Sequence, residues 1–140
     1  MAPDRHKVTA YISIAKGNAP FLKEEVDVVK GTLAAAGIES RVFVEQYTFI
    51  GDQEKEMMHQ AMTDIDACAL FIAEVSEKAI GVGLEAGYAK AKGKAIIYLR
   101  QKDAEHSTTV SGISDYQLIY SDRGDLKTGL EKIIKLWLSR

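Results

Sequence analysis

The sequence contains a single cysteine and no long apolar stretch. Cys68 has no second cysteine with which to form an internal disulfide, and its place in the apolar run CALFIAEV favours a small buried side chain over a nucleophile. No apolar run approaches the roughly 20 residues needed to span a bilayer, and the opening MAPDRHK is too polar for a secretion signal. We therefore expect a soluble cytoplasmic protein with no membrane partner.

The sequence also has no excess of basic residues over acidic ones. The chain carries 18 lysines and arginines against 20 acidic residues, for a net charge of -2, which argues against binding to long nucleic acid. The three histidines, His6, His59 and His106, are scattered without metal-ligand spacing, so neither a zinc site nor a Ser/His catalytic triad is predicted. We expect no metal ion and no organic cofactor. A small anionic ligand is compatible with this charge.

What the sequence does contain is a regular alternation of strand and helix patterns. Its 140 residues, 46% of them hydrophobic, suit one domain spanning residues 1–140. Strand patterns occupy residues 7–15, 41–46, 68–75, 95–100 and 116–121. Helical spacing of apolar residues occupies 20–37, 53–66, 81–93 and 125–140, and a polar linker covers 101–115. The alternation predicts an α/β fold of flavodoxin-like or Rossmann-like kind, a five-stranded parallel sheet in the order 2-1-3-4-5 with helices on both faces.

Candidate site residues gather where the first and third strands end. In such sheets ligands bind beyond the carboxyl ends of the strands, near the point where the strand order reverses. The first strand leads from Tyr11 and Ser13 to Lys16 and Gly17, and the third leads into the stretch EVSEKAIGVGLEAG at residues 74–87. Glycines at a helix start let backbone N–H groups approach an anion. The spacing leaves two interpretations of Glu85 open, a functional carboxylate or an acid that merely suits the helix dipole.

A longer segment, EVSEKAIGVGLEAGYAKAKGKAIIYL, resembles the signature of the nucleoside 2-deoxyribosyltransferase family, especially its branch of 2′-deoxynucleoside 5′-phosphate N-hydrolases. The element order agrees over nearly the whole chain, and residues 66–100 match closely. The resemblance implies that Glu85 attacks C1′ of a deoxyribose and that Tyr11 orients its carboxylate. Such chemistry is that of a retaining glycosidase. The implied substrate is a small-molecule nucleoside or nucleotide.

The family also has an aspartate on the second helix, about one turn after the residue that matches His59. In this chain that position falls on Ala61 or, with one gap, on Met62. Asp64 lies one helical turn beyond Ala61 on the same face and is the candidate substitute, with a solvated helix acid as the alternative. The sequence therefore leaves open which residue assists the departing base by protonation or hydrogen bonding.

Hydrolases of this branch wrap the 5′-phosphate in a serine- and glycine-rich loop, where this chain has SIAKGN. The resemblance implies a phosphate pocket built from Lys16, Gly17, Gly81 and Gly83, the last two at the helix start. It further implies a homodimer or higher homo-oligomer in which Ser107, within HSTTVSG, reaches the pocket of a neighbouring subunit. Each of these segments could equally be a plain surface loop.

Three other interpretations share the fold. A receiver-like signalling module needs paired aspartates after the first strand, where this chain has Lys16-Gly17-Asn18, and a flavodoxin-like carrier needs a hydroxyl-rich phosphate loop that is absent from the sequence. A catalytically quiet nucleotide-binding protein, which keeps Glu85 but lacks the family aspartate, is the main alternative to an enzyme. Release of free base from a nucleoside or nucleotide would separate the two.

Overall fold

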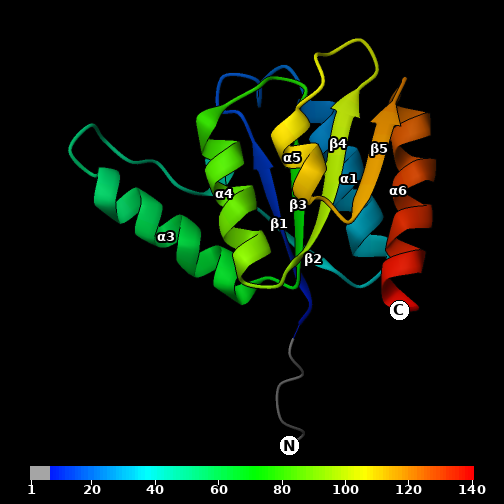
Figure 1. Cartoon of the computed structure of the whole chain (residues 1–140), viewed down its shortest axis with the longest axis horizontal. Helices are drawn as coiled ribbons and strands as arrows, with labels where there is room; N and C mark the ends of the chain where they lie inside the picture. Colours follow the sequence, from blue (N-terminus) through cyan, green and yellow to red (C-terminus); the bar gives the residue numbers. More distant parts are fainter. Residues whose placement is uncertain (1–6) are drawn as a thin grey trace, which may run out of the picture.

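A five-stranded parallel sheet in the order β2-β1-β3-β4-β5 forms the centre of the computed structural model, which describes residues 7–140 (Figure 1). The strands are β1 (Thr9–Ile14), β2 (Glu39–Val42), β3 (Leu70–Glu74), β4 (Ala95–Gln101) and β5 (Tyr116–Tyr120). The helices are α1 (Lys23–Ala35), α2 (Phe43–Gln46), α3 (Glu54–Ala67), α4 (Ile80–Ala91), α5 (Thr108–Ile113) and α6 (Arg123–Leu138). The α/β fold and strand order expected from the sequence are confirmed. His6 lies outside the described residues.

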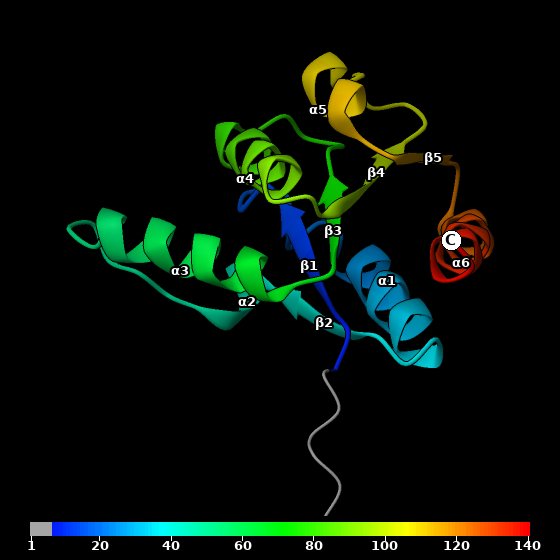
Figure 2. The same ribbon diagram turned by 60° about the horizontal axis from the view of Figure 1, so that its bottom comes forward.

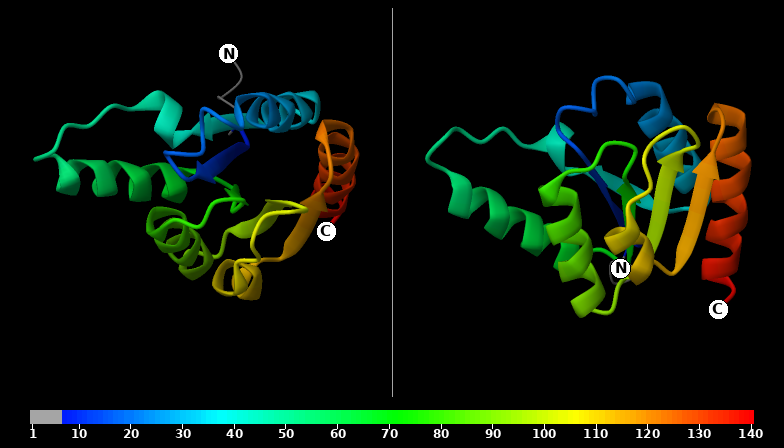
Figure 3. Two further views of the ribbon diagram at one scale, coloured as in Figure 1. Left: turned by 90° about the horizontal axis from the view of Figure 1, so that it is seen from above. Right: turned by 45° about the horizontal axis from the view of Figure 1, so that its top comes forward.

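Helices cover both faces of the sheet. Helices α1 and α6 pack on one face, while α3, α4 and α5 lie on the other (Figures 2 and 3). The inward side of α6 consists of the apolar residues expected from its spacing, Leu126, Leu130, Ile133, Ile134 and Trp137, all of them buried. All five residues of β3 are buried as well, which explains why its sequence is almost continuously apolar.

Side-chain alternation along β1 decides which residues reach the site. Ala10, Ile12 and Ile14 belong to the core under α1 and α6, whereas Tyr11 belongs to the core under α3 and α4. Because successive side chains of a strand point to opposite faces, Ser13 shares the face of Tyr11. In the sheet register Ser13 lies opposite Ala73 and Ile14 opposite Glu74. Tyr11 and Ser13 are therefore directed toward α4.

Two glycines end helices where the sequence indicated. Gly37 after α1 and Gly93 after α4 have φ angles of 77° and 74°, a left-handed conformation that other residues adopt only with strain. Helix α1 begins at Lys23 and not at Pro20, because residues 16–22 form turns whose N–H groups bond to the carbonyls of Ala15 and Asn18. The loop after β1 thus extends into the segment 20–37 that was expected to be helical.

Two sequence-based expectations were wrong in detail. Residues 41–46 were expected to be a strand, but the strand ends at Val42 and residues 43–46 form the short helix α2. There the chain turns so that Phe43 buries its ring 6.2 Å from that of Tyr11, and this packing overrides the strand preference of the sequence. The supposed linker at 101–115 contains α5, which is anchored by the buried Val110.

Cys68 is buried and unpaired, as expected, and burial raises the pKa of its thiol to about 11. At neutral pH the side chain is therefore a protonated thiol, and a cysteine acts as a nucleophile only as the thiolate. Across residues 7–140, no helix is both long enough and apolar enough to cross a bilayer.

Candidate active site

Glu85 occupies the second turn of α4, on the side that faces β1. The helix packs Val82, Ala86 and Ala89 against the sheet, a spacing of four and three residues that leaves the neighbouring Glu85 half-buried at the edge of the contact. Its Oε1 accepts a hydrogen bond of 2.6 Å from the hydroxyl of Ser13. Strand β1 and helix α4 thus meet at this carboxylate.

The environment of Glu85 acts on its pKa in two directions. Burial disfavours the charged form and raises the pKa above its ordinary value of 4.5, whereas the hydroxyls of Ser13 and Tyr11 stabilise the anion and lower it. Burial is the larger influence. The result is a partly dehydrated carboxylate held in one orientation, which is the condition of a carboxylate nucleophile.

Tyr11 stands beside this carboxylate, inside the core. Its ring stacks on Phe71 with 5.5 Å between ring centroids and 9° between planes, and the residue is fully buried. Among residues 7–140 its hydroxyl has no hydrogen-bond partner. Burial, together with the nearby charge of Glu85, holds the pKa of Tyr11 well above its usual range, so the hydroxyl keeps its proton.

A cavity of about 170 Å³ opens in front of Glu85 at the carboxyl edge of the sheet. Three of the sequence-derived candidates line it together with Glu85, namely Ser13, Lys16 and Gly81. Much of the remaining lining is apolar and includes Phe43, Met57 and Met58. The cavity therefore combines an oriented carboxylate, a lysine and an apolar surface, the mixture typical of a small-molecule site.

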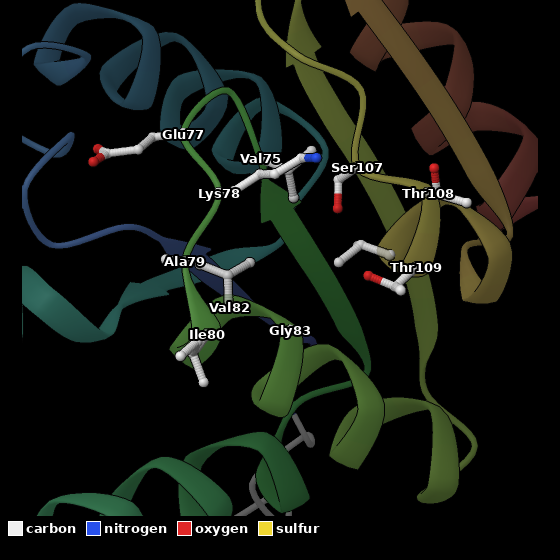
Figure 4. A pocket seen from close by; sticks show the side chains of 11 residues that line it. Val75, Glu77, Lys78, Ala79, Ile80, Val82, Gly83, Ser107, Thr108 and Thr109 are labelled. Carbon is white, nitrogen blue, oxygen red and sulfur yellow. The ribbon is translucent and has the colours of Figure 1, made fainter.

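Three further candidates lie outside this cavity wall. Gly17 is exposed beside the Glu77 carboxylate, which lies 3.9 Å from the position of a Cβ placed on the glycine. Gly83 and Ser107 line a second cavity, of about 410 Å³, on the other side of the connection between β3 and α4. In Figure 4, Ser107 and Thr109 lie across this cavity from the start of α4.

The two cavities share Ala79 and Val82. Ser107 itself is buried, and its backbone N–H donates to the hydroxyl of Tyr98 at 3.0 Å. Within one chain, Ser107 thus lies on the far side of residues 77–82 from Glu85.

Asp64 is buried and does not line the cavity at Glu85. Its Oδ1 forms an ion pair with Nη1 of Arg41 at 3.3 Å and accepts a hydrogen bond from Nε2 of Gln60 at 2.9 Å. The aspartate is therefore no solvated helix acid. Sequence reasoning missed Arg41 and Gln60, although Gln60 precedes Asp64 by four residues on one helix, the spacing at which side chains meet.

Glu74, the acid at the end of β3, has both carboxylate oxygens engaged in hydrogen bonds within the fold. Its two carboxylate oxygens accept hydrogen bonds of 2.6 Å, one from the Tyr120 hydroxyl and one from the Ser76 backbone N–H. Burial raises its pKa. Since these bonds tie β3 to β5 and to the following turn, Glu74 serves the fold, whereas Glu85 lines the cavity at the carboxyl edge of the sheet. Within residues 7–140, no group of three histidine, cysteine or acidic side chains is arranged to hold a metal ion.

No protein-family model matches this chain, and no curated protein matches it. Solved structures do match. A CMP N-glycosidase from Clostridium botulinum is similar over 88% of this chain and 98% of its own, with a TM-score of 0.67 and 20% identity. A conserved protein from Enterococcus faecalis has a TM-score of 0.67 and 15% identity, over 90% of this chain and 98% of its own.

A 2-deoxyribosyltransferase from Bacillus psychrosaccharolyticus is also similar, over 86% of this chain and 90% of its own, with a TM-score of 0.67 and 13% identity. At such identities the likeness shows that these proteins share a fold with this chain.

Proposed function

We propose that this protein cleaves or transfers the N-glycosidic bond of a 2′-deoxyribonucleoside or its 5′-monophosphate, with Glu85 as the nucleophile. The observation that carries the proposal is the Glu85 carboxylate, fixed by a 2.6 Å hydrogen bond from Ser13 and facing a cavity. The fold shared with a CMP N-glycosidase and a 2-deoxyribosyltransferase supports the same reaction class. The sequence resemblance at residues 66–100 agrees with both.

In the proposed reaction an oxygen of Glu85 attacks C1′ of the sugar from the face opposite the base. The bond between C1′ and the base nitrogen breaks, its electron pair leaves with the base, and the sugar becomes esterified to Glu85. Water, or a second base that bears an N–H group, then displaces Glu85 from C1′; the proton that it gives up passes to the departed base, and the carboxylate is free again. Ser13 and Tyr11 orient the nucleophile, because both hydroxyls favour its ionised form.

The apolar wall of the cavity suits the base. Phe43, Met57 and Met58 present an aromatic ring and two flexible thioether side chains, which can accommodate a planar heterocycle. Lys16 and the N–H of Gly81, which line the same cavity, offer a positive charge and a hydrogen-bond donor at the start of α4. We assign the 5′-phosphate to these two groups, with Gly17 beside them.

We further propose that the protein forms a homodimer through the outer side of α4. Ile80 and Leu84, one turn apart, are 85% and 59% exposed, an unusual degree for large apolar residues beside a site. A neighbouring subunit seated there could bring its Ser107 to the phosphate. Light scattering on the wild type and on Leu84→Glu tests this, with a dimer that becomes a monomer as the expected result. A monomeric wild type would contradict it.

Free base is the product that tests the proposed activity. The protein is incubated with each of the four common deoxyribonucleosides and their 5′-monophosphates, and the mixture is separated by chromatography. We expect release of base from one or more of these compounds, or exchange when a second base is added. Absence of both from every compound, with a folded protein, would contradict the activity.

A catalytically quiet nucleotide-binding protein is the second candidate. The position of Asp64 favours it, because this carboxylate is engaged by Arg41 and Gln60 and does not line the cavity where a departing base would need a proton. Calorimetric binding of a nucleotide without any release of base would identify this case.

A further inference from the structure

Four buried side-chain polar atoms of residues 7–140 have no hydrogen-bond partner, and two of them belong to neighbouring parts of the structure. The Tyr11 hydroxyl and Oδ2 of Asp64 are both inaccessible to solvent, and neither has a partner among residues 7–140. A buried group that makes no hydrogen bond costs about 1–3 kcal/mol, so a donor and an acceptor left unpaired in the same region call for a physical explanation.

The strand register brings these groups together through Arg41. Tyr11 on β1 lies directly opposite Arg41 on β2, and side chains at paired positions of neighbouring strands share a face of the sheet. Nη1 of Arg41 is 3.3 Å from Oδ1 of Asp64, so the arginine holds the aspartate next to the strand that carries Tyr11. Glu85 accepts a hydrogen bond from Ser13, which lies two residues along β1 from Tyr11 on the same face of the sheet.

Tyr11 therefore has two carboxylates near it and a single proton to donate. The charges of Glu85 and Asp64 both raise the pKa of its hydroxyl, after the larger effect of burial. A phenolic hydroxyl can donate one hydrogen bond, and a bond to an ionised acceptor is about twice as strong as a neutral one. The two carboxylates thus compete for one donor, and the outcome depends on which of them is already satisfied.

We propose that Arg41 is a positioning residue for Glu85: by engaging Asp64, it leaves the Tyr11 hydroxyl free to donate to the Glu85 carboxylate. Gln60, which donates to the same oxygen of Asp64, assists it. The role of Glu85 as nucleophile rests on the proposed function, whereas the competition for the Tyr11 proton is a property of the folded protein alone.

Removal of Arg41 should change which carboxylate receives the hydrogen bond of Tyr11. Without the guanidinium, the buried Asp64 carboxylate has lost its counter-ion and takes the hydrogen bond of Tyr11. The Tyr11 proton is then held by Asp64 and no longer favours the ionised form of Glu85, so the pKa of Glu85 rises. The groups that face Tyr11 and Glu85 from the surrounding elements are Ser13 on β1, Lys16 after it, Arg41 on β2, Tyr47 after α2, Asp64 on α3 and Cys68 before β3.

The test is the titration of Glu85 in the free protein, followed by the ¹³C signal of its side-chain carboxyl group, which is assigned by its loss in Glu85→Gln. Arg41→Met should raise the midpoint by about one pH unit, equal to a tenfold change in proton affinity. Adding Asp64→Asn to Arg41→Met should return the midpoint to the wild-type value, because the competing carboxylate is gone. Arg123→Met, which removes an exposed arginine paired with Glu24 and Glu25, is the matched control and should leave the midpoint unchanged.

An unchanged midpoint in folded Arg41→Met would overturn the proposal, and so would a midpoint that stays raised in the double variant. If Arg41→Met does not fold, Arg41→Gln, which keeps a hydrogen-bond donor without the charge, replaces it with the same expected direction. Activity is measured separately. A shifted midpoint in a protein that releases no base would reject the proposed function and keep the coupling, and the reverse pattern would reject only the coupling.

Discussion

The hydroxyl of Ser13 and the carboxylate of Glu85, 72 positions apart in the sequence, are joined by a hydrogen bond of 2.6 Å. The bond connects β1, beside the centre of the sheet, to α4, which packs over it. Because the donor is neutral and the acceptor is charged in its active form, the bond favours the ionised carboxylate. Ser13 is thus the residue through which the sheet contacts Glu85, the proposed nucleophile.

Ser13→Ala should slow base release and shift its dependence on pH. Loss of the bond raises the pKa of Glu85 further, so activity should fall away at a higher pH on the acid side than in the wild type. A charge-assisted bond contributes about 1.5–3 kcal/mol, which corresponds to roughly ten- to hundredfold in kcat/KM. Rates measured from about pH 4 to 8 check this. Ser139→Ala, at the distant end of α6, is the control, and identical profiles for the wild type and Ser13→Ala would contradict the assignment.

Glu85→Gln should make the protein more stable at neutral pH. Since the pKa of Glu85 is raised above 4.5, the folded state binds this proton more tightly than the unfolded state does. The stability linked to this group is therefore present below about pH 4.5 and lost as the pH rises through the folded-state pKa.

Thermal unfolding of the wild type and Glu85→Gln should accordingly coincide near pH 4 and separate at pH 7, where each kcal/mol appears as roughly 2–8 °C in Tm. Glu105→Gln, an exposed acid paired with Lys78, serves as the control. A less stable Glu85→Gln at pH 7 would show that burial does not penalise the carboxylate.

Lys16→Ala should reduce the preference for a 5′-monophosphate over its nucleoside. Lys16 lines the cavity of Glu85, and loss of a charge-assisted contact should cost about 1.5–3 kcal/mol in binding of the phosphate form only. Calorimetric titration of both ligands measures the difference, which added salt should weaken. Lys78→Ala, which lies on the neighbouring cavity, is the matched control. Equal affinity of the wild type for both ligands would remove the phosphate from the proposal.

Two glycines, one inside α1 and one just after it, should respond in opposite ways to alanine. Gly31 lies inside α1 with nothing within 4 Å of an added Cβ, so Gly31→Ala should raise the free energy of unfolding by about 0.5–1 kcal/mol. Gly37 has a φ of 77°, so Gly37→Ala should lower it by about 1 kcal/mol or more. Urea denaturation of both variants decides this, and equal effects would contradict the helix end assigned to Gly37.

The fold could be predicted because the sequence repeats one signal. Each strand is a short apolar or β-branched run, and each long helix has an apolar stripe. The crossover connections of β-α-β units are right-handed, which limits the possible strand orders. The failures were local. Phe43 carries no mark that separates a strand residue from one that turns inward to meet Tyr11, and α5 has a single buried apolar anchor, Val110, which is too little for helical periodicity.

The candidate site was predictable where backbone direction alone places a side chain. Ser13 and Glu85 meet because β1 and α4 both end or begin at the carboxyl edge of the sheet, a consequence of topology. The pairing of Arg41 with Asp64 was not predictable, because it depends on the register between β1 and β2 and on the rotation of α3. Ser107 was expected to approach a neighbouring subunit, and its place within one chain leaves that expectation a prediction.

The central claim is that Glu85 forms a covalent bond to the sugar. Protein that is turning over a substrate identified by base release is quenched in acid, digested and examined by mass spectrometry. We expect a deoxyribosyl adduct on the peptide that contains Glu85, and neither adduct nor base release in folded Glu85→Gln. Base release by Glu85→Gln at the wild-type rate, or an adduct on another residue of the wild type, would contradict the account.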